Sequence, residues 1–125
     1  MAKEKMNVQE IVIDGTTYVP KDQSTLAKEK DGMNYVCVRT YSAGVHCGYL
    51  KERNGKEGVL LDSIRIWQWA GAASLSQLAM EGVNNPLSCK FAIPVNEITL
   101  TEIIEVIPMT EVAKANIQNV PLWRK

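Results

Sequence analysis

The sequence predicts an α+β domain, mostly antiparallel β-sheet in a meander of hairpins, with one or two short helices. Three observations support this fold class. β-Branched and aromatic residues gather in short runs, as they do in strands. Asp-Gly and Asn-Gly pairs, which favour the positive φ angles of tight hairpin turns, interrupt the sequence between such runs. Helix-starting patterns occur in only two places, both late in the chain.

The first 33 residues are predicted to be an appendage to the core domain, which is expected to span residues 34–125. Within residues 10–20, Asp14-Gly15 separates two β-rich runs and predicts an N-terminal hairpin. Residues 20–33 are polar and nearly devoid of β-branched residues, which is typical of a linker.

Strands are expected in the core at residues 35–40, 45–50, 58–61 and 64–69. A loop of small residues at 41–44 separates the first two, and Asn54-Gly55 indicates a second hairpin turn. Residues 90–95 are predicted to be an edge strand, because Pro94 cannot donate a ladder hydrogen bond. Residues 98–108 could form a strand or a helix, and their β-branched residues favour the strand.

Two helices complete the predicted core. Ser74 followed by Gln77 has the pattern of a capping box, and Gly82 is a typical helix end. Thr110 is expected to cap a second helix that runs through Ile117 and ends before Pro121.

Composition excludes several functional classes. The 14 Lys and Arg residues balance the 14 Asp and Glu residues, so the chain lacks the net positive charge that drives binding to bulk nucleic acid. No apolar run is long enough to span a membrane, and no signal peptide is visible. The three cysteines are widely spaced and odd in number, which favours free thiols in a reducing cytoplasm.

One segment, residues 39–46, concentrates groups that could bind a ligand. A guanidinium, hydroxyls, a phenol and the only imidazole flank a glycine, so the loop could hold an oxyanion. Alternatively, it is a hairpin corner whose Ser and Thr hydroxyls bind their own backbone. The imidazole could serve in acid–base chemistry or be a hydrogen-bonded structural residue. The candidate ligand-binding residues here are Arg39, Thr40, Tyr41, Ser42, Gly44 and His46.

A second cluster lies on the strand predicted at 64–69. Strand alternation places Arg65, Trp67 and Trp69 on one face, where they could stack on a planar ring and bind carboxylate or phosphate. The same tryptophans could instead face the core, with the arginine at its edge. Trp123 near the C-terminus is a further anchor, within the chain or onto a second subunit, and a homo-oligomer is expected.

No metal site or cofactor is expected. The one adjacent His/Cys pair, His46-Cys47, lies on a predicted strand, where neighbouring side chains point to opposite faces and cannot easily share a metal. A phosphodiesterase or nuclease would need a metal cluster that the sequence does not offer. We therefore expect a protein that is not an enzyme.

Several stretches resemble a family of short, functionally uncharacterised proteins of phages and prophages. The stretches are YVCVRTYSAGVHCG at 35–48, KERNGKE at 51–57, RIWQWAGA at 65–72, SLSQLA at 74–79 and LTEIIEVIP at 100–108. The most specific part is YSAGVH at 41–46, within a segment of the form RTYSAGVHxG. The resemblance implies a protein of the host bacterial cytoplasm or of a virion, and it transfers no catalytic role.

Two functions from different classes remain open at this point. In the first, the protein binds and sequesters a nucleotide-derived ligand, such as a bacterial immune signal, and so acts as an anti-defence protein. This rests on the analogy that small phage proteins without an enzyme motif often interfere with host defence. In the second, it is a protein-interaction or virion accessory module that binds a host or virion protein through an edge strand or a Trp face.

Overall fold

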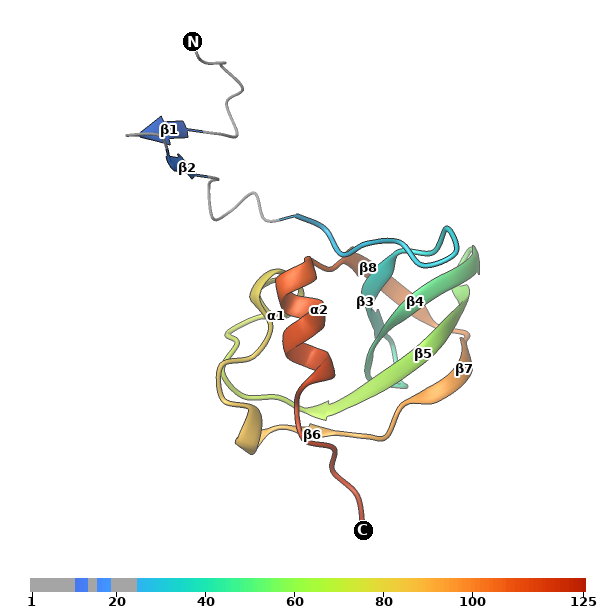
Figure 1. Ribbon diagram of the computed structural model, residues 1–125. Helices are drawn as coiled ribbons and strands as arrows, with labels where there is room; N and C mark the ends of the chain where they lie inside the picture. The colour runs from blue at the N-terminus through green and yellow to red at the C-terminus, as the bar shows by residue number, and fades with distance from the viewer. Residues whose placement is uncertain (1–10, 14–15, 19–24) are drawn as a thin grey trace.

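The computed structural model describes residues 11–13, 16–18 and 25–125 (Figure 1). Its first elements are the short strands β1 (Ile11–Ile13) and β2 (Thr16–Tyr18), which pair antiparallel. This pairing agrees with the predicted N-terminal hairpin. The predicted turn, Asp14-Gly15, lies outside the described residues.

The core is a six-stranded antiparallel sheet, and the predicted α+β class is confirmed. The strand order is β6-β5-β4-β3-β8, with β7 paired to β5 as well. The strands are β3 (Tyr35–Thr40), β4 (Val45–Asn54), β5 (Glu57–Gln68), β6 (Lys90–Phe91), β7 (Val95–Leu100) and β8 (Ile103–Pro108).

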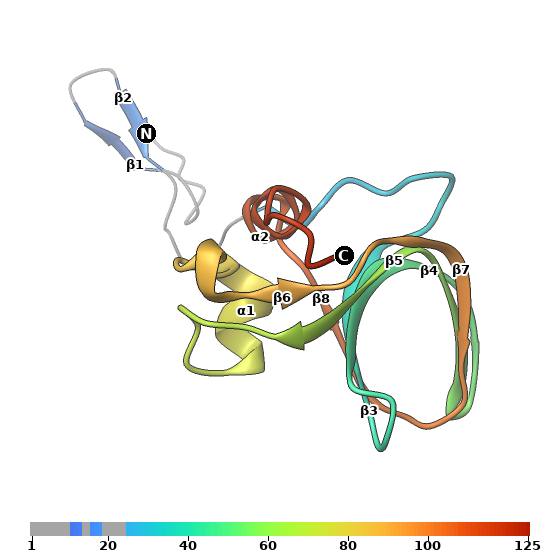
Figure 2. The same cartoon turned by 90° about the horizontal axis from the view of Figure 1, so that it is seen from below.

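The sheet curls so strongly that β3, β4, β5, β7 and β8 together form a nearly closed ring (Figure 2). The strand β5 makes this possible because its first part pairs with β7 and its end pairs with β6. Sequence analysis predicted two strands here, but Asp62 at φ 51° introduces an irregularity within a single bent strand. Gly48 lets β4 and β5 approach closely, since a Cβ there would lie 2.9 Å from the Leu61 carbonyl oxygen.

Side-chain alternation along these strands creates two apolar cores. One fills the ring and contains Val36, Val38, Leu60, Leu100 and Ile103. The other lies on the outer face of the sheet, beneath α1 (Leu75–Glu81) and α2 (Glu111–Gln118) (Figure 2). Its members include Tyr35, Cys37, Cys47, Ile64, Leu78, Phe91 and Ile117.

Both helices begin at the predicted caps. The Ser74 hydroxyl accepts a hydrogen bond from the Gln77 N–H at 3.1 Å, and the Thr110 hydroxyl accepts one from the Ala113 N–H at 3.0 Å. Gln77 also reaches back, although its side chain accepts from the Ala73 N–H rather than from the cap residue itself.

The segment between residues 90 and 108 differs in detail from the prediction. The expected edge strand at 90–95 is only the two residues of β6, and after the interruption that contains Pro94 the chain pairs with β5 again as β7. A short helical turn, η2 (Pro86–Ser88), precedes it. The strand interpretation of residues 98–108 is confirmed, but two strands occupy the region, with a turn at Thr101-Glu102.

Chain segments on either side of the core elements pack against them. Ala27 is buried, and its N–H donates to the Met109 carbonyl at 3.0 Å, although this stretch was predicted to be linker. At the other end, the Trp123 N–H donates to the Phe91 carbonyl at 2.8 Å and so holds the C-terminal tail beside β6. The predicted domain boundary at residue 34 stays a prediction.

Candidate functional site

The corner, which we define as residues 41–44 between β3 and β4, is exposed but uses several of its polar groups internally. The buried Thr40 hydroxyl donates to the Gly44 carbonyl at 2.8 Å and accepts from the Ala43 N–H at 2.9 Å. The Ser42 hydroxyl donates to the carboxylate of Glu102. For these two hydroxyls the structure therefore fits the alternative in which the corner is stabilised by its own hydrogen bonds.

Two other predicted site residues of this segment lie apart from the hollows described below. Arg39 forms an ion pair with Glu105 across the β3–β8 ladder, with 3.0 Å between Nε and Oε1. Both side chains are about half exposed. The Tyr41 side chain is 80% exposed and lines neither hollow.

The first hollow, which we call the outer hollow, brings the two predicted clusters together. It has a volume of about 320 Å³. Arg65 and Trp67 of β5 form one wall, and the corner forms the other. The lining residues are Ser42, Ala43, Gly44, Arg65, Ile66 and Trp67.

The two tryptophans of the second predicted cluster have different environments. Trp67 is 65% exposed, and its ring stacks on Trp123 with 6.5 Å between centroids and 14° between planes. Trp69 lies beyond the end of β5 and is half-buried against the core beneath the helices. Alternation along the strand predicted one shared face, but β5 ends at Gln68, so the pattern does not extend to Trp69.

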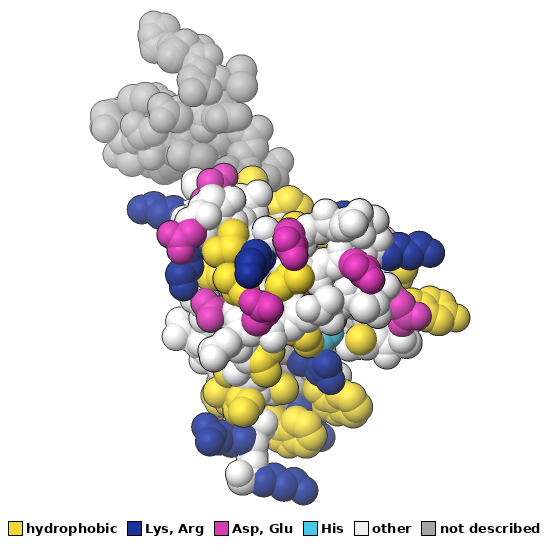
Figure 3. Space-filling model, turned by 90° about the vertical axis from the view of Figure 1, so that its right-hand side faces the viewer, with side chains coloured by type: hydrophobic (Ala, Val, Ile, Leu, Met, Phe, Trp, Pro, Cys, Tyr) yellow, Lys and Arg dark blue, Asp and Glu magenta, His cyan; other side chains and the backbone are white. Residues whose placement is uncertain are grey.

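A second hollow, the inner chamber, opens on the other side of Arg65 and has a volume of about 270 Å³. His46 lies on the same sheet face as the ring core, because it pairs with Val38 of β3 and with Arg65 of β5. Figure 3 shows basic and apolar side chains close together on one face of the molecule. The lining residues are His46, Ser63, Arg65, Ala92, Ile93, Val95 and Ile98.

His46 is fully buried, and its hydrogen bonding determines which proton it carries. The Ala43 carbonyl lies 3.0 Å from Nε2 and can only accept, so Nε2 carries the hydrogen. Burial lowers the pKa of His46, and the Arg65 charge opposite lowers it further, although the bond to Ala43 acts the other way. The imidazole is therefore neutral at pH 7, and Nδ1 presents a free lone pair.

Two residues that line the inner chamber each have a buried polar atom without a hydrogen-bond partner among the described residues. The atoms are His46 Nδ1 and the hydroxyl oxygen of Ser63, whose residue is only 1% exposed. A buried polar atom without a partner costs about 1–3 kcal/mol of stability. Ser63 was not among the residues predicted for the site, although strand alternation from Arg65 and Trp67 could have placed it on their face.

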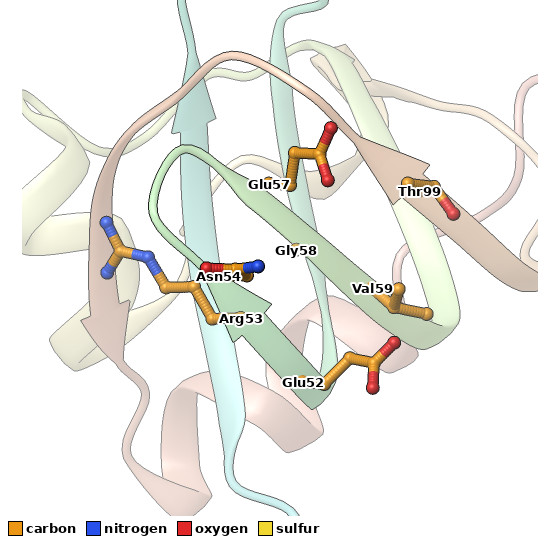
Figure 4. A pocket seen from close by; sticks show the side chains of 7 residues that line it. All are labelled: Glu52, Arg53, Asn54, Glu57, Gly58, Val59 and Thr99. Atoms are coloured by element: carbon orange, nitrogen blue, oxygen red, sulfur yellow. The ribbon is translucent and has the colours of Figure 1, made fainter.

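A third hollow lies on the β4–β5 hairpin, far along the strands from His46, and has a volume of about 370 Å³ (Figure 4). In Figure 4 the carboxylates of Glu52 and Glu57 lie at opposite ends of the hollow, and Arg53 points away from both. Its polar side chains are all exposed, so nothing comparable to the unpartnered groups of the inner chamber lines it. This hollow is larger than the inner chamber, but its lining offers no buried polar group that lacks a partner.

Two further observations concern only the part of the chain that the structure describes. No group of three or more His, Cys, Asp or Glu side chains lies close enough to hold a metal ion. No helix there is both long and apolar enough to cross a membrane.

Comparison with known proteins places the chain in a family but not in a functional class. Residues 33–117 match the model of a family described as "Domain of unknown function (DUF6948)", so the chain belongs to that family. Searches of curated proteins and of solved structures gave no match. The matched region contains β3 through most of α2, and with them His46, Ser63, Arg65 and Trp67.

Proposed function

We propose that this member of the DUF6948 family binds a small nucleotide-derived ligand and does so without catalysing its conversion. One observation carries the proposal. Arg65 and Trp67 share the outer hollow with the corner, so two clusters some twenty residues apart in the sequence form one concave surface. Small-molecule sites are typically concavities of this kind, mostly apolar with a few convergent polar groups.

Each wall of the outer hollow has a role in this proposal. The exposed face of Trp67 stacks on a nucleobase, an interaction worth about 1–3 kcal/mol per base. The Arg65 guanidinium binds phosphate oxygens in the two-pronged geometry that this side chain favours. The corner closes the opposite side with main chain and small side chains. Arg39, which the sequence suggested for the phosphate, instead pairs with Glu105.

The biological role that we propose is sequestration in a bacterial host cell. The resemblance to phage and prophage proteins motivates it, because a phage protein that removes a nucleotide immune signal from solution needs affinity but no chemistry.

Titration calorimetry tests the proposal directly. The probes are a panel of cyclic mono- and dinucleotides and cyclic ADP-ribose isomers, injected into the folded protein. We expect at least one to bind, and Trp67→Ala and Arg65→Ala each to weaken it by about tenfold to a hundredfold. Arg53→Ala is the matched control, because Arg53 is exposed on the hairpin hollow away from this site. No heat with any probe would overturn the proposal.

A second function, a protein-interaction or virion accessory module, is favoured by a different observation. Large exposed apolar side chains gather beside the two-residue strand β6 and the tail that pairs with it. Trp67, Ile93, Leu122 and Trp123 are between 38% and 65% exposed. Under this function, Trp123→Ala abolishes capture of a host or virion protein, whereas Arg65→Ala does not.

The expected homo-oligomer is also a proposal, and analytical ultracentrifugation would check it.

A further inference from the structure

The inner chamber contains two buried polar groups that form no hydrogen bond with any other residue that the structure describes. His46 Nδ1 and Ser63 Oγ are buried and lack partners, and the two residues line the same cavity. Folded proteins satisfy the large majority of buried polar groups, so two such groups on one cavity wall indicate that the partner is not part of the chain.

The chemistry of the missing partner follows from the two groups. His46 Nδ1 can only accept, since Nε2 holds the proton that is donated to the Ala43 carbonyl. The Ser63 hydroxyl can donate or accept. The other walls, Ala92, Ile93, Val95 and Ile98, are apolar and suit the faces of a flat ring. The partner is thus a group with an N–H or O–H donor on an apolar frame.

The positive charge of Arg65 indicates that the missing partner is neutral. Arg65 lies opposite His46 in the β4–β5 ladder and lines the chamber as well as the outer hollow. A cationic donor would meet the guanidinium at close range, and an anion would have no proton to give to His46. Arg65 is free to bind an anionic part of the same ligand between the two hollows.

We infer that the inner chamber is a specificity subsite that takes the uncharged donor edge of the ligand, namely the exocyclic amine of a nucleobase. The inference rests on the proposed function and deepens it. The amine donates to His46 Nδ1, Ser63 binds a neighbouring ring nitrogen, and Arg65 holds the phosphate. A ligand that also stacks on Trp67 then has two ring systems on either side of one anionic linker.

A matched pair of fragments tests the subsite independently of the full ligand. The probes are 9-methyladenine and 6,9-dimethylpurine, in which a methyl group replaces the amine at nearly the same size. Because His46 is the only histidine, its ring nitrogens give unambiguous NMR signals. We expect 9-methyladenine to move the Nδ1 resonance at millimolar concentration, and 6,9-dimethylpurine to bind at least tenfold more weakly.

Variants separate the subsite from the outer hollow. Ser63→Ala should weaken 9-methyladenine about fivefold or more, whereas Arg53→Ala, on the separate hairpin hollow, should leave it unchanged. Equal affinity of the two purines, or no movement of Nδ1 because water alone fills the chamber, would overturn the subsite. If calorimetry still shows a nucleotide bound through Trp67, the proposed function survives that failure. Conversely, 9-methyladenine binding that is unchanged in Trp67→Ala, with no nucleotide binding at all, would keep the subsite and remove the proposed function.

Discussion

The two polar side chains that join α1 to α2, Thr110 and Asn116, are hydrogen-bonded, whereas His46 and Ser63 of the inner chamber each have a buried polar atom without a partner among the described residues. The Thr110 hydroxyl donates to the Met80 carbonyl at 2.7 Å, and the Asn116 amide binds both main-chain groups of Val83 at 2.8 Å. His46 Nδ1 and the Ser63 hydroxyl have no such partners. The polar groups that join the two helices therefore contribute to stability, although the Tyr35 hydroxyl in the core beneath them lacks a partner, as the two chamber groups do.

The largest expected effect on stability comes from the hydrogen bonds that link α2 to the end of α1. Asn116→Ala removes both hydrogen bonds to Val83 and leaves the N–H and C=O of this buried residue unpaired, so we expect a loss of about 3 kcal/mol in the free energy of unfolding. Urea denaturation measures it. The control is Asn119→Ala at the exposed end of the same helix, which should cost less than about 1 kcal/mol. Equal losses would mean that the two Val83 bonds carry no special stability.

The second prediction concerns pH and follows from the lowered pKa of His46. In the unfolded chain the imidazole takes up a proton near pH 6.5, while the folded protein resists protonation until a lower pH. The unfolded state thus binds more protons between these values. We expect the free energy of unfolding to fall as the pH drops below about 6.5, by at most about 1.4 kcal/mol per pH unit from this group.

An NMR titration checks the premise of that prediction in the folded protein. The histidine signals should change with a midpoint below pH 6.5, with Nε2 carrying the proton in the neutral form. A midpoint at or above 6.5 would show that the chamber tolerates a charged imidazole, and it would remove the argument for a neutral partner.

The third prediction compares two serines and expects opposite signs. Ser63→Ala removes an unpartnered buried hydroxyl, so we expect the ligand-free protein to gain about 1 kcal/mol in unfolding free energy. Ser74→Ala removes the α1 cap and should lose about 1 kcal/mol. Thermal unfolding of both variants measures the contrast. A loss for Ser63→Ala would indicate that the hydroxyl stabilises the empty chamber after all.

The smallest effect is expected at Arg39. Its ion pair with Glu105 is half exposed, so Arg39→Ala should change stability by less than about 1 kcal/mol. Because Arg39 lines neither hollow, the variant should also bind every ligand of the wild type with unchanged affinity in calorimetry. A hundredfold loss of affinity would restore Arg39 to the site that the sequence suggested.

Local patterns predicted much of the fold but only part of the site. The caps at Ser74 and Thr110 and the turn at Asn54-Gly55 depend on neighbouring residues, so sequence alone reveals them. The bend at Asp62 was missed because a positive φ at aspartate depends on its tertiary surroundings. The position of Trp69 was also missed, because the strand β5 ends at Gln68 and side-chain alternation does not extend beyond it.

The class of the fold and the starts of both helices could be predicted from the residues alone, and the candidate site residues near positions 39–46 and 65–67 were named from them. Only the tertiary structure decided how these residues combine. Pairing of β4 with β5 in the curled sheet brought Arg65 beside both the corner and His46 and placed Ser63 at a cavity. The reason is physical: hydrogen bonds within a turn are short-range and can be read from the chain, whereas a cavity arises from distant strands.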